Sequence, residues 1–173
     1  MKNNPDIPVA LSLGANVGDC VSGMRKAIDA LSSFMTVTAV SSVYEADPVY
    51  VLDQPIFLNA AITGLTKINP LALMWTIKDI ESDLGRGPTY QYGPRVIDID
   101  IIFYGDMIIK TPELIIPHMR MEEREFVLRP LQEIASDWKH PGNGKTVSEM
   151  LQDFPDVTLK CLGNILTNDT AKQ

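Results

Sequence analysis

Hydrophobic and polar positions along the chain follow two periods, and their order predicts the fold. Apolar residues at helical spacing mark two predicted helices, whereas alternating or continuous apolar runs mark predicted strands. The predicted strands cover residues 7–14, 35–45 and 57–65 and a stretch within 93–104, and the predicted helices cover residues 21–34 and 70–84. The order β-α-β-β-α-β is typical of the ferredoxin-like α+β fold, a mostly antiparallel sheet with two helices on one face.

Turn and capping residues divide these elements. Asp19 is a plausible cap of the first helix, Asn69-Pro70 opens the second helix, and Gly85 ends it. Loops are expected over residues 45–54 and 86–94, which contain proline or glycine. Trp75 and Trp138 are expected to be core or half-buried residues.

Further elements are predicted after the strand within residues 93–104. The pattern indicates a hairpin over 107–116, a helix over 122–135 with a break at Pro130, and a short helix over 146–152. These elements can cover the other face of the sheet and produce a three-layer sandwich. The whole of 1–173 is predicted to be one domain, with a frayed polar tail after residue 167.

The composition narrows the class of protein. The chain has 173 residues, of which 45% are hydrophobic and 21% charged, as in globular proteins of one domain. It contains no apolar run of the roughly 20 residues that cross a bilayer, so no membrane contact is expected. Cys20 and Cys161 show no metal-ligand spacing, which favours a reduced, cytoplasmic protein. A net charge of −7 argues against nucleic acid as a partner, but allows a local arginine cluster around a small polyanion.

Two carboxylates lie two residues apart in the last predicted strand of the core. Side chains alternate along a strand, so Asp98 and Asp100 share one face, and Ile97, Ile99 and Ile101 fill the other. Neighbouring anions favour a cation, and Mg²⁺ prefers oxygen ligands that it shares with substrate phosphates. The alternative is an edge strand with one solvated face, which produces the same alternation.

Basic residues around this pair favour phosphate chemistry. Arg86 and Arg95 lie in the loop before the strand, and His118 and Arg124 follow it. The planar guanidinium of arginine donates two hydrogen bonds to phosphate and stays charged. Each arginine alone is more typical of a solvated surface, and a lone histidine is more often structural.

Two familiar phosphate-binding motifs do not apply. Residues 141–146 end like a P-loop, but Lys139 occupies the position of the first glycine, so a turn before a helix is expected. In residues 14–18, Asn16 replaces the second glycine of a dinucleotide-binding fingerprint, which favours a turn at the end of a strand. Elsewhere, Phe57 and Asn59 share a strand face and either pack in the core or hold a flat heterocycle.

Several motifs together resemble one enzyme family. Gly93-Pro94-Arg95-Val96-Ile97-Asp98-Ile99-Asp100-Ile101 resembles the signature of the 6-hydroxymethyl-7,8-dihydropterin pyrophosphokinases of folate synthesis. The likeness extends over nearly the whole chain, and the further matching motifs are Ser12–Asn16, Ser41–Tyr44, Asp53–Ala61, Glu81–Arg86, Pro117-His118 and Arg124–Leu131.

The resemblance implies a ferredoxin-like fold and a role for each matching residue. Asp98 and Asp100 would hold two Mg²⁺ ions on ATP, the co-substrate. Phosphate and AMP contacts would come from Arg86, Arg95, Arg124 and His118, with Glu81 on the nucleotide side. Phe57 and Phe126 would enclose the pterin, Asn59 would bind its edge, and Val49 and Tyr92 would adjoin it. The partners would be these small molecules, for a monomer that can contact the next folate-pathway enzyme.

The chain departs from the family pattern at four places. Pro88 replaces a frequent second arginine, Tyr92 a frequent tryptophan, and Glu113 an arginine of some members, and Ala46-Asp47 replaces a threonine-proline pair. These changes make the site loops less basic, while both carboxylates remain. The other hypotheses are a ferredoxin-like ligand-binding module without chemistry and a two-metal nuclease, which the net charge disfavours.

Overall fold

The computed structural model describes residues 4–155 and 159–166. The elements in chain order are β1 (Ile7–Ala15), α1 (Cys20–Leu31), β2 (Thr36–Val40), β3 (Ser42–Ala46), β4 (Phe57–Thr66), α2 (Pro70–Asp83), β5 (Asp98–Tyr104), β6 (Ile109–Lys110), β7 (Ile115–Ile116), a 3₁₀ turn (Met121–Glu123), α3 (Glu125–Ala135), α4 (Val147–Leu151) and β8 (Lys160–Asn164). The predicted tail after residue 167 lies outside the described residues.

One antiparallel sheet forms the centre of the molecule. Its strand order is β5-β1-β4-β3-β8, and β2 also pairs with β4. The central strand β1 is antiparallel to both β4 and β5. The predicted βαββαβ core is therefore confirmed, with its second strand divided in two.

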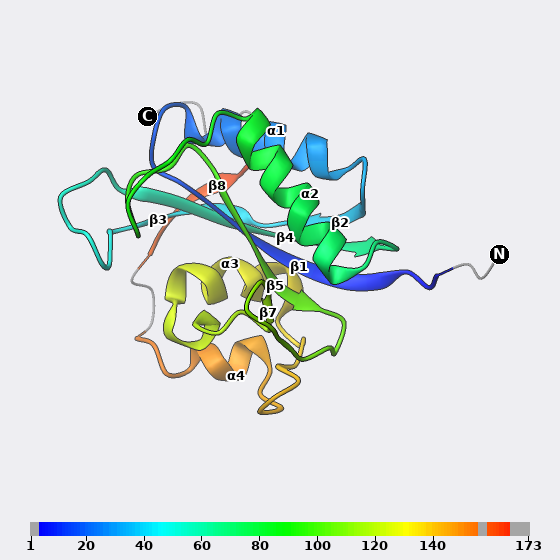
Figure 1. The fold of residues 1–173 in the computed structure, drawn as a ribbon. Helices are drawn as coiled ribbons and strands as arrows, with labels where there is room; N and C mark the ends of the chain where they lie inside the picture. The colour runs from blue at the N-terminus through cyan, green and yellow to red at the C-terminus, as the bar shows by residue number, and fades with distance from the viewer. Residues whose placement is uncertain (1–3, 156–158, 167–173) are drawn as a thin grey trace.

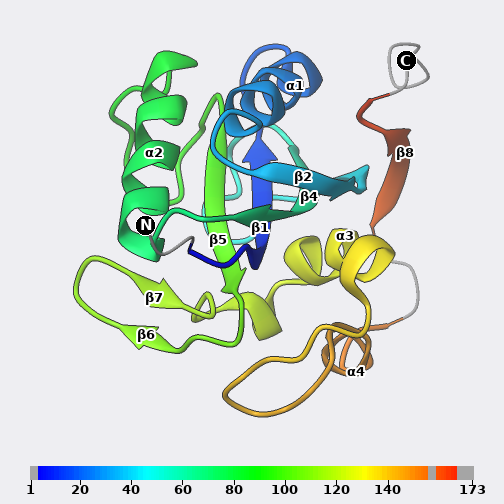
Figure 2. The same cartoon turned by 90° about the vertical axis from the view of Figure 1, so that its right-hand side faces the viewer.

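The sheet has helices on both faces, which gives three layers (Figures 1 and 2). Helices α1 and α2 cover one face over a core that includes Leu11, Leu13 and Ile62, and α3 and α4 cover the other over Ile102 and Phe103. The predicted three-layer sandwich is thus confirmed. Within the described residues, no helix is long and apolar enough to cross a membrane.

Three helix starts are fixed by the expected side-chain chemistry. The side chains of Asp19 and Asn69 accept hydrogen bonds from the backbone at the starts of α1 and α2. Thr146 forms a capping box with Glu149 at the start of α4, so residues 141–146 are a turn before a helix, as predicted. Gly85 follows α2 with a φ of +96°, a conformation that glycine adopts without strain.

The single strand predicted over 35–45 is wrong. The strand is interrupted at Ser41, whose hydroxyl accepts a hydrogen bond from the Ala61 N–H at 2.8 Å. The side-chain oxygen thus takes a place that a backbone carbonyl would hold in a continuous ladder, and β2 and β3 pair with β4 separately.

The predicted helix break at Pro130 is also wrong, because α3 continues through this residue, which is buried. The expectation for Trp75 is wrong: it is 55% exposed, because α2 uses Leu73, Met74 and Ile77 for its buried side. Trp138 is half-buried, as expected. Strand β8 was not predicted, because it is only five residues long and its residues show no regular alternation of polar and apolar side chains.

Candidate active site

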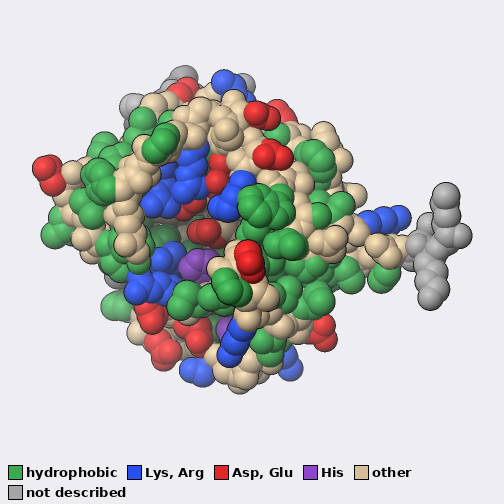
Figure 3. Space-filling view, in the orientation of Figure 1, with side chains coloured by type: hydrophobic (Ala, Val, Ile, Leu, Met, Phe, Trp, Pro, Cys, Tyr) green, Lys and Arg blue, Asp and Glu red, His purple; other side chains and the backbone are tan. Residues whose placement is uncertain are grey.

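A cleft of about 440 Å³ opens between the sheet, the loop after β3, the loop after α2 and the segment that leads into α3. Figure 3 shows this face, where arginine, acidic and histidine side chains gather in a hollow. All twelve residues singled out from the sequence line it: Val49, Phe57, Asn59, Glu81, Arg86, Tyr92, Arg95, Asp98, Asp100, His118, Arg124 and Phe126. The fold therefore brings together side chains from four separate segments.

The two aspartates lie on the face of β5 that is turned toward α3. In register they stand opposite Gly14 and Ser12 of β1, and both positions are only partly exposed. Ile97 and Ile99 are buried in the core on the opposite face, as the alternation predicts. The small β1 residues leave the space in front of the carboxylates open.

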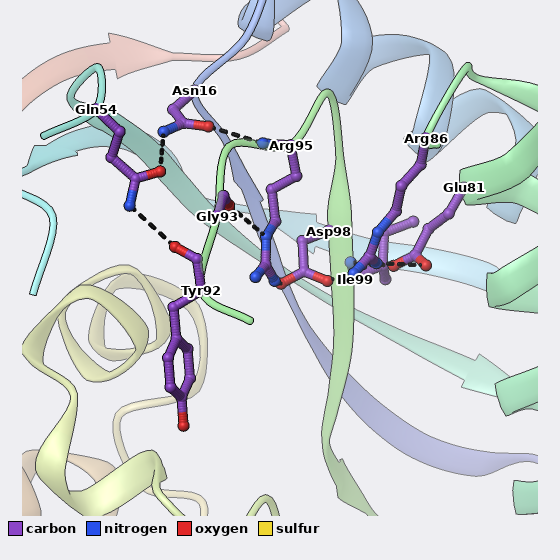
Figure 4. Close-up of polar contacts among 9 residues, drawn as sticks. All are labelled: Asn16, Gln54, Glu81, Arg86, Tyr92, Gly93, Arg95, Asp98 and Ile99. Carbon is purple, nitrogen blue, oxygen red and sulfur yellow. Dashed lines mark hydrogen bonds and ion pairs between the residues drawn. The ribbon is translucent and has the colours of Figure 1, made fainter. Parts of the chain in front are cut away.

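Asp98 is held by two guanidinium groups (Figure 4). Its Oδ1 lies 2.7 Å from Arg86 Nη1, and its Oδ2 lies 2.7 Å from Arg95 Nη1. Burial alone would lower the pKa of Arg86, but Asp98 and Glu81 outweigh it and raise this pKa. Arg86 is thus charged, and both guanidinium groups lie beside the predicted metal ligand.

Glu81 connects α2 with β5 through a buried carboxylate. Only 4% of the residue is exposed, and its Oε1 accepts a hydrogen bond from the Ile99 N–H at 2.7 Å. Its Oε2 lies 2.6 Å from Arg86 Nη1, and burial raises the pKa of the carboxyl. Glu81 therefore positions Arg86 and satisfies a donor on the outer side of β5 (Figure 4).

Asp100 and His118, which also line the cleft, have pKa values far from the ordinary values of their side chains. Burial and the neighbouring Asp98 raise the pKa of Asp100 to about 7, although Arg124 opposes this shift. Burial and Arg124 lower the pKa of His118 to about 4, so its ring is neutral near pH 7. His118 Nδ1 accepts a hydrogen bond from the Arg120 N–H at 3.2 Å, which leaves the proton of the neutral ring on Nε2.

Two buried donors face the cleft without a partner among the described residues. They are Asn59 Nδ2 and Arg124 Nε. Unpaired buried donors are costly, so such groups are expected where a ligand supplies the acceptor. Phe57 lies on the same strand face as Asn59, and the Arg124 guanidinium lies 5.6 Å from the centre of the Phe126 ring. This end of the cleft suits a flat molecule with acceptors on its edge.

Sequence reasoning missed the residues that join the two loops of the cleft. Asn16 Nδ2 donates to Gln54 Oε1 and to Pro55 O, both at 3.0 Å, and Asn16 Oδ1 accepts the Arg95 N–H at 2.9 Å. Gln54 Nε2 donates to Tyr92 O at 2.9 Å (Figure 4). Partners that lie 38 or 79 positions apart leave no periodic signal in a sequence.

The carboxylate pair fits Mg²⁺ that arrives with a phosphate ligand. No group of three or more histidine, cysteine or acidic side chains suited to a metal exists in residues 4–155 and 159–166. Mg²⁺ is commonly held by one or two carboxylates together with water and substrate phosphates. Burial first, and the neighbouring Asp98 second, raise the pKa of Asp100, and a cation bound beside it would oppose both effects. The donor set therefore suits a metal that is shared with a nucleotide.

A second hollow of about 280 Å³ adjoins the cleft and shares Asp100 and His118 with it. Its other walls are mainly apolar and include Ile77, Ile101 and Leu114. An apolar hollow beside a polar cleft with charged side chains of both signs matches a molecule with a flat ring at one end and charged groups beyond it.

A cleft that holds arginines and paired carboxylates and adjoins an apolar hollow suits an enzyme that acts on a nucleotide polyphosphate. The family model of 7,8-dihydro-6-hydroxymethylpterin-pyrophosphokinase matches residues 10–136. The chain belongs to this family, as the sequence motifs predict.

Relatives and solved structures agree with this assignment. The chain is 40% identical to 2-amino-4-hydroxy-6-hydroxymethyldihydropteridine pyrophosphokinase of Aquifex aeolicus, over 88% of this chain and 93% of that protein. It is 46% identical to the mitochondrial folate synthesis bifunctional protein of Arabidopsis thaliana, over 73% of this chain but only 23% of that protein. A crystal structure of Plasmodium falciparum HPPK-DHPS shares the fold, with a TM-score of 0.71 and 17% identity over 88% of this chain and 45% of that one.

Proposed function

We propose that this protein transfers the pyrophosphoryl group of ATP to the hydroxymethyl group of 6-hydroxymethyl-7,8-dihydropterin, with AMP as the other product. The observation that carries the proposal is one cleft that joins a site for a flat heterocycle to a carboxylate pair with arginines. The Aquifex relative, which the chain matches over most of its length, is named for this pyrophosphokinase activity.

The pterin would occupy the aromatic end of the cleft. Phe57 and Phe126 would contact the faces of its ring, and Val49 and Tyr92 would lie at its border. The unpaired Asn59 Nδ2 would donate to an acceptor on the ring edge. A buried amide that finds its partner only in the ligand favours pterins over apolar rings of the same size.

ATP would extend from the second hollow into the cleft. The adenine would contact Ile77, Ile101 and Leu114, and the triphosphate would pass His118 toward the arginines. Asp98 and Asp100 would hold the two Mg²⁺ ions that the family resemblance implies, and ions bound there would neutralise phosphate charge and orient the reacting groups.

The protein would act mainly by positioning and by charge neutralisation, which dominate phosphoryl transfer. The pterin hydroxyl oxygen would lose its proton to the solvent and form a bond to the β-phosphorus, and the bond between this phosphorus and the α–β bridging oxygen would break, so that the α-phosphate leaves with AMP. Arg86 and Arg95 would exchange their contacts with Asp98 for contacts with the phosphates. Arg124 would donate a hydrogen bond from its unpaired Nε to a phosphate oxygen. Their loop would also exclude water that could otherwise hydrolyse ATP.

The test is to incubate the protein with ATP, Mg²⁺ and the hydroxymethyl pterin and to separate the nucleotides. The proposal expects AMP and the pterin diphosphate in equal amounts, and no AMP when the pterin is omitted. ADP would indicate an ordinary kinase, and unchanged ATP would indicate a binding module; either result contradicts the proposal.

Arg95→Ala and Asn59→Ala are expected to change different kinetic constants, kcat in the first variant and KM for the pterin in the second. Arg95 would contact groups that change during transfer, so its loss should lower kcat about 100-fold and change KM for the pterin less than threefold. Asn59 would bind the ring throughout, so its loss should raise this KM about tenfold with a smaller change in kcat. Steady-state kinetics at saturating MgATP measure both. A rise in KM as large as the fall in kcat for Arg95→Ala would instead indicate a structural role.

The setting of the protein is also part of the proposal. We infer a monomer that can contact the enzyme of the next folate step, since several relatives carry the matched region inside bifunctional proteins. The chain spans about a quarter of the length of the first of those relatives. The two free cysteines, Cys20 and Cys161, support the cytoplasmic location expected from the sequence.

A further inference from the structure

Three residues from separate segments meet at the mouth of the cleft, and we call them the rim cluster: Tyr50, Tyr92 and Arg120. The rings of Tyr50 and Tyr92 stack with their centres 4.2 Å apart and an angle of 28° between them. The Arg120 guanidinium lies 5.3 Å from the centre of the Tyr50 ring and 6.0 Å from that of Tyr92. Its Nη1 also donates a hydrogen bond to the Tyr92 hydroxyl at 3.0 Å.

Tyr92 has a backbone conformation that does not persist without support. Its φ is +60°, and it is the one non-glycine residue with positive φ in the described part of the chain. The left-handed region is disfavoured for a side chain of this size. Two contacts hold it: Gln54 donates to its carbonyl, and the ring, which extends away from Gln54 (Figure 4), accepts a hydrogen bond from Arg120 at its hydroxyl.

The backbone of Arg120 is connected to the sheet through His118, and its guanidinium lies at the protein surface. Its backbone N–H donates to His118 Nδ1, and the His118 N–H donates to Ile102 O of β5 at 3.1 Å. A continuous chain of contacts therefore runs from β5 through His118 and Arg120 to Tyr92. Tyr92 precedes Arg95 by three residues in the loop that also begins with Arg86, and these are the two arginines that hold Asp98.

We propose that Arg120 is a positioning residue, which holds the loop of residues 85–97 over the cleft so that Arg86 and Arg95 are placed before substrates bind. This inference rests on the proposed function for its kinetic consequence but not for its structural one. Arginine suits the task because its planar group can lie over two rings and donate a directed hydrogen bond at the same time. Holding the loop beforehand lowers the ordering cost of binding.

The direct test uses hydrogen exchange of the free protein, with the backbone of residues 86–94 as the readout. Arg120→Gln is expected to increase exchange there fivefold to tenfold and to leave the central strands β1 and β4 unchanged. Tyr92→Phe, which removes only the bonded hydroxyl, should give a smaller increase. The double variant should exceed Arg120→Gln alone only slightly, because both changes break the same contact.

Arg129→Gln is the matched control, since Arg129 lies outside the cleft in an ion pair with Glu125 of α3. It should leave exchange of residues 86–94 unchanged. Unaltered exchange in Arg120→Gln, or additive effects of the two rim changes, would overturn the proposal. An increase spread over the whole protein would also overturn it, because it would show that Arg120 acts on global stability.

Kinetics separate this proposal from the proposed function. If AMP forms as expected, Arg120→Gln should raise KM for the pterin fivefold to tenfold while kcat falls less than threefold, because the loop still closes once substrates are bound. If the wild-type protein makes no AMP but the exchange result holds, the proposed function fails and the positioning role of Arg120 stands. If AMP forms but exchange does not change in Arg120→Gln, the proposed function stands and the positioning role of Arg120 fails.

Discussion

Asp98→Asn is expected to lower kcat at least about 1000-fold, since a removed centre of charge stabilisation in phosphoryl transfer costs several kcal/mol. Asparagine keeps the size of the side chain but removes the charge that would hold Mg²⁺ and order Arg86 and Arg95. Formation of AMP over time, measured with saturating MgATP and pterin, gives the value. Binding of Mn²⁺ in the presence of a non-hydrolysable ATP analogue should weaken in parallel.

The fold should survive this change. The Asp98 side chain is 21% exposed, and the asparagine amide oxygen can still accept a hydrogen bond from one of the two arginines. Asp106→Asn, at an exposed turn after the same strand, is the matched control and should keep full activity and the same melting temperature. Near-normal turnover in Asp98→Asn would show that the metal assignment is wrong.

The parts of the fold that follow one period could be predicted from the sequence. The alternation around Asp98 and Asp100 places both on one strand face, and the helical spacing of Met74, Ile77 and Ile80 gives α2 its buried side. These signals are local, because one buried face selects apolar residues at regular intervals. The core order and the positions of the carboxylates were predicted for that reason.

The errors arise where a tertiary contact overrides a local rule. Ser41 interrupts a strand because its hydroxyl replaces a ladder acceptor for Ala61. Pro130 remains inside α3 because that helix is packed on the sheet, where burial outweighs one lost backbone hydrogen bond. Strand β8 forms because the edge of β3 is available to it. None of these partners is near in sequence.

The candidate site shows the same division between local and long-range information. All twelve predicted residues line one cleft, because strand ends and loops that are separate in sequence converge beside β1. The residues that keep the loops in place, Asn16, Gln54, Tyr50 and Arg120, were missed. Each acts through one or two contacts with another loop, and such contacts impose no spacing on the sequence.

Asp100→Asn is expected to stabilise the free protein at pH 8 while it removes activity. The ordinary pKa of this carboxyl is 3.8, and burial together with Asp98 raises the folded value to about 7. The folded state therefore retains a proton that the unfolded state loses between these pH values. Stability falls as pH rises from about 4 to about 7 and stays reduced above that range. An uncharged amide at this position removes the loss.

The expected gain in the free energy of unfolding at pH 8 is about 2 kcal/mol. A rise of three pKa units sets an upper bound of about 4 kcal/mol, and relaxation around the charged group reduces it. Urea denaturation at pH 8 and at pH 4 measures the difference, which should vanish at the lower pH. Asp106→Asn should show no gain at either pH.

Addition of Mg²⁺ and ATP should reverse the order of stability at pH 8. Wild type would gain stability because bound ligands favour the folded state, whereas Asp100→Asn would gain little, since it lacks one of the two carboxylates. A lower stability of Asp100→Asn at pH 8 without ligands would show that the carboxylate is held by favourable contacts instead. The cost of keeping a buried carboxylate charged beside Asp98 would then be absent, and with it one electrostatic reason to expect a cation at this pair.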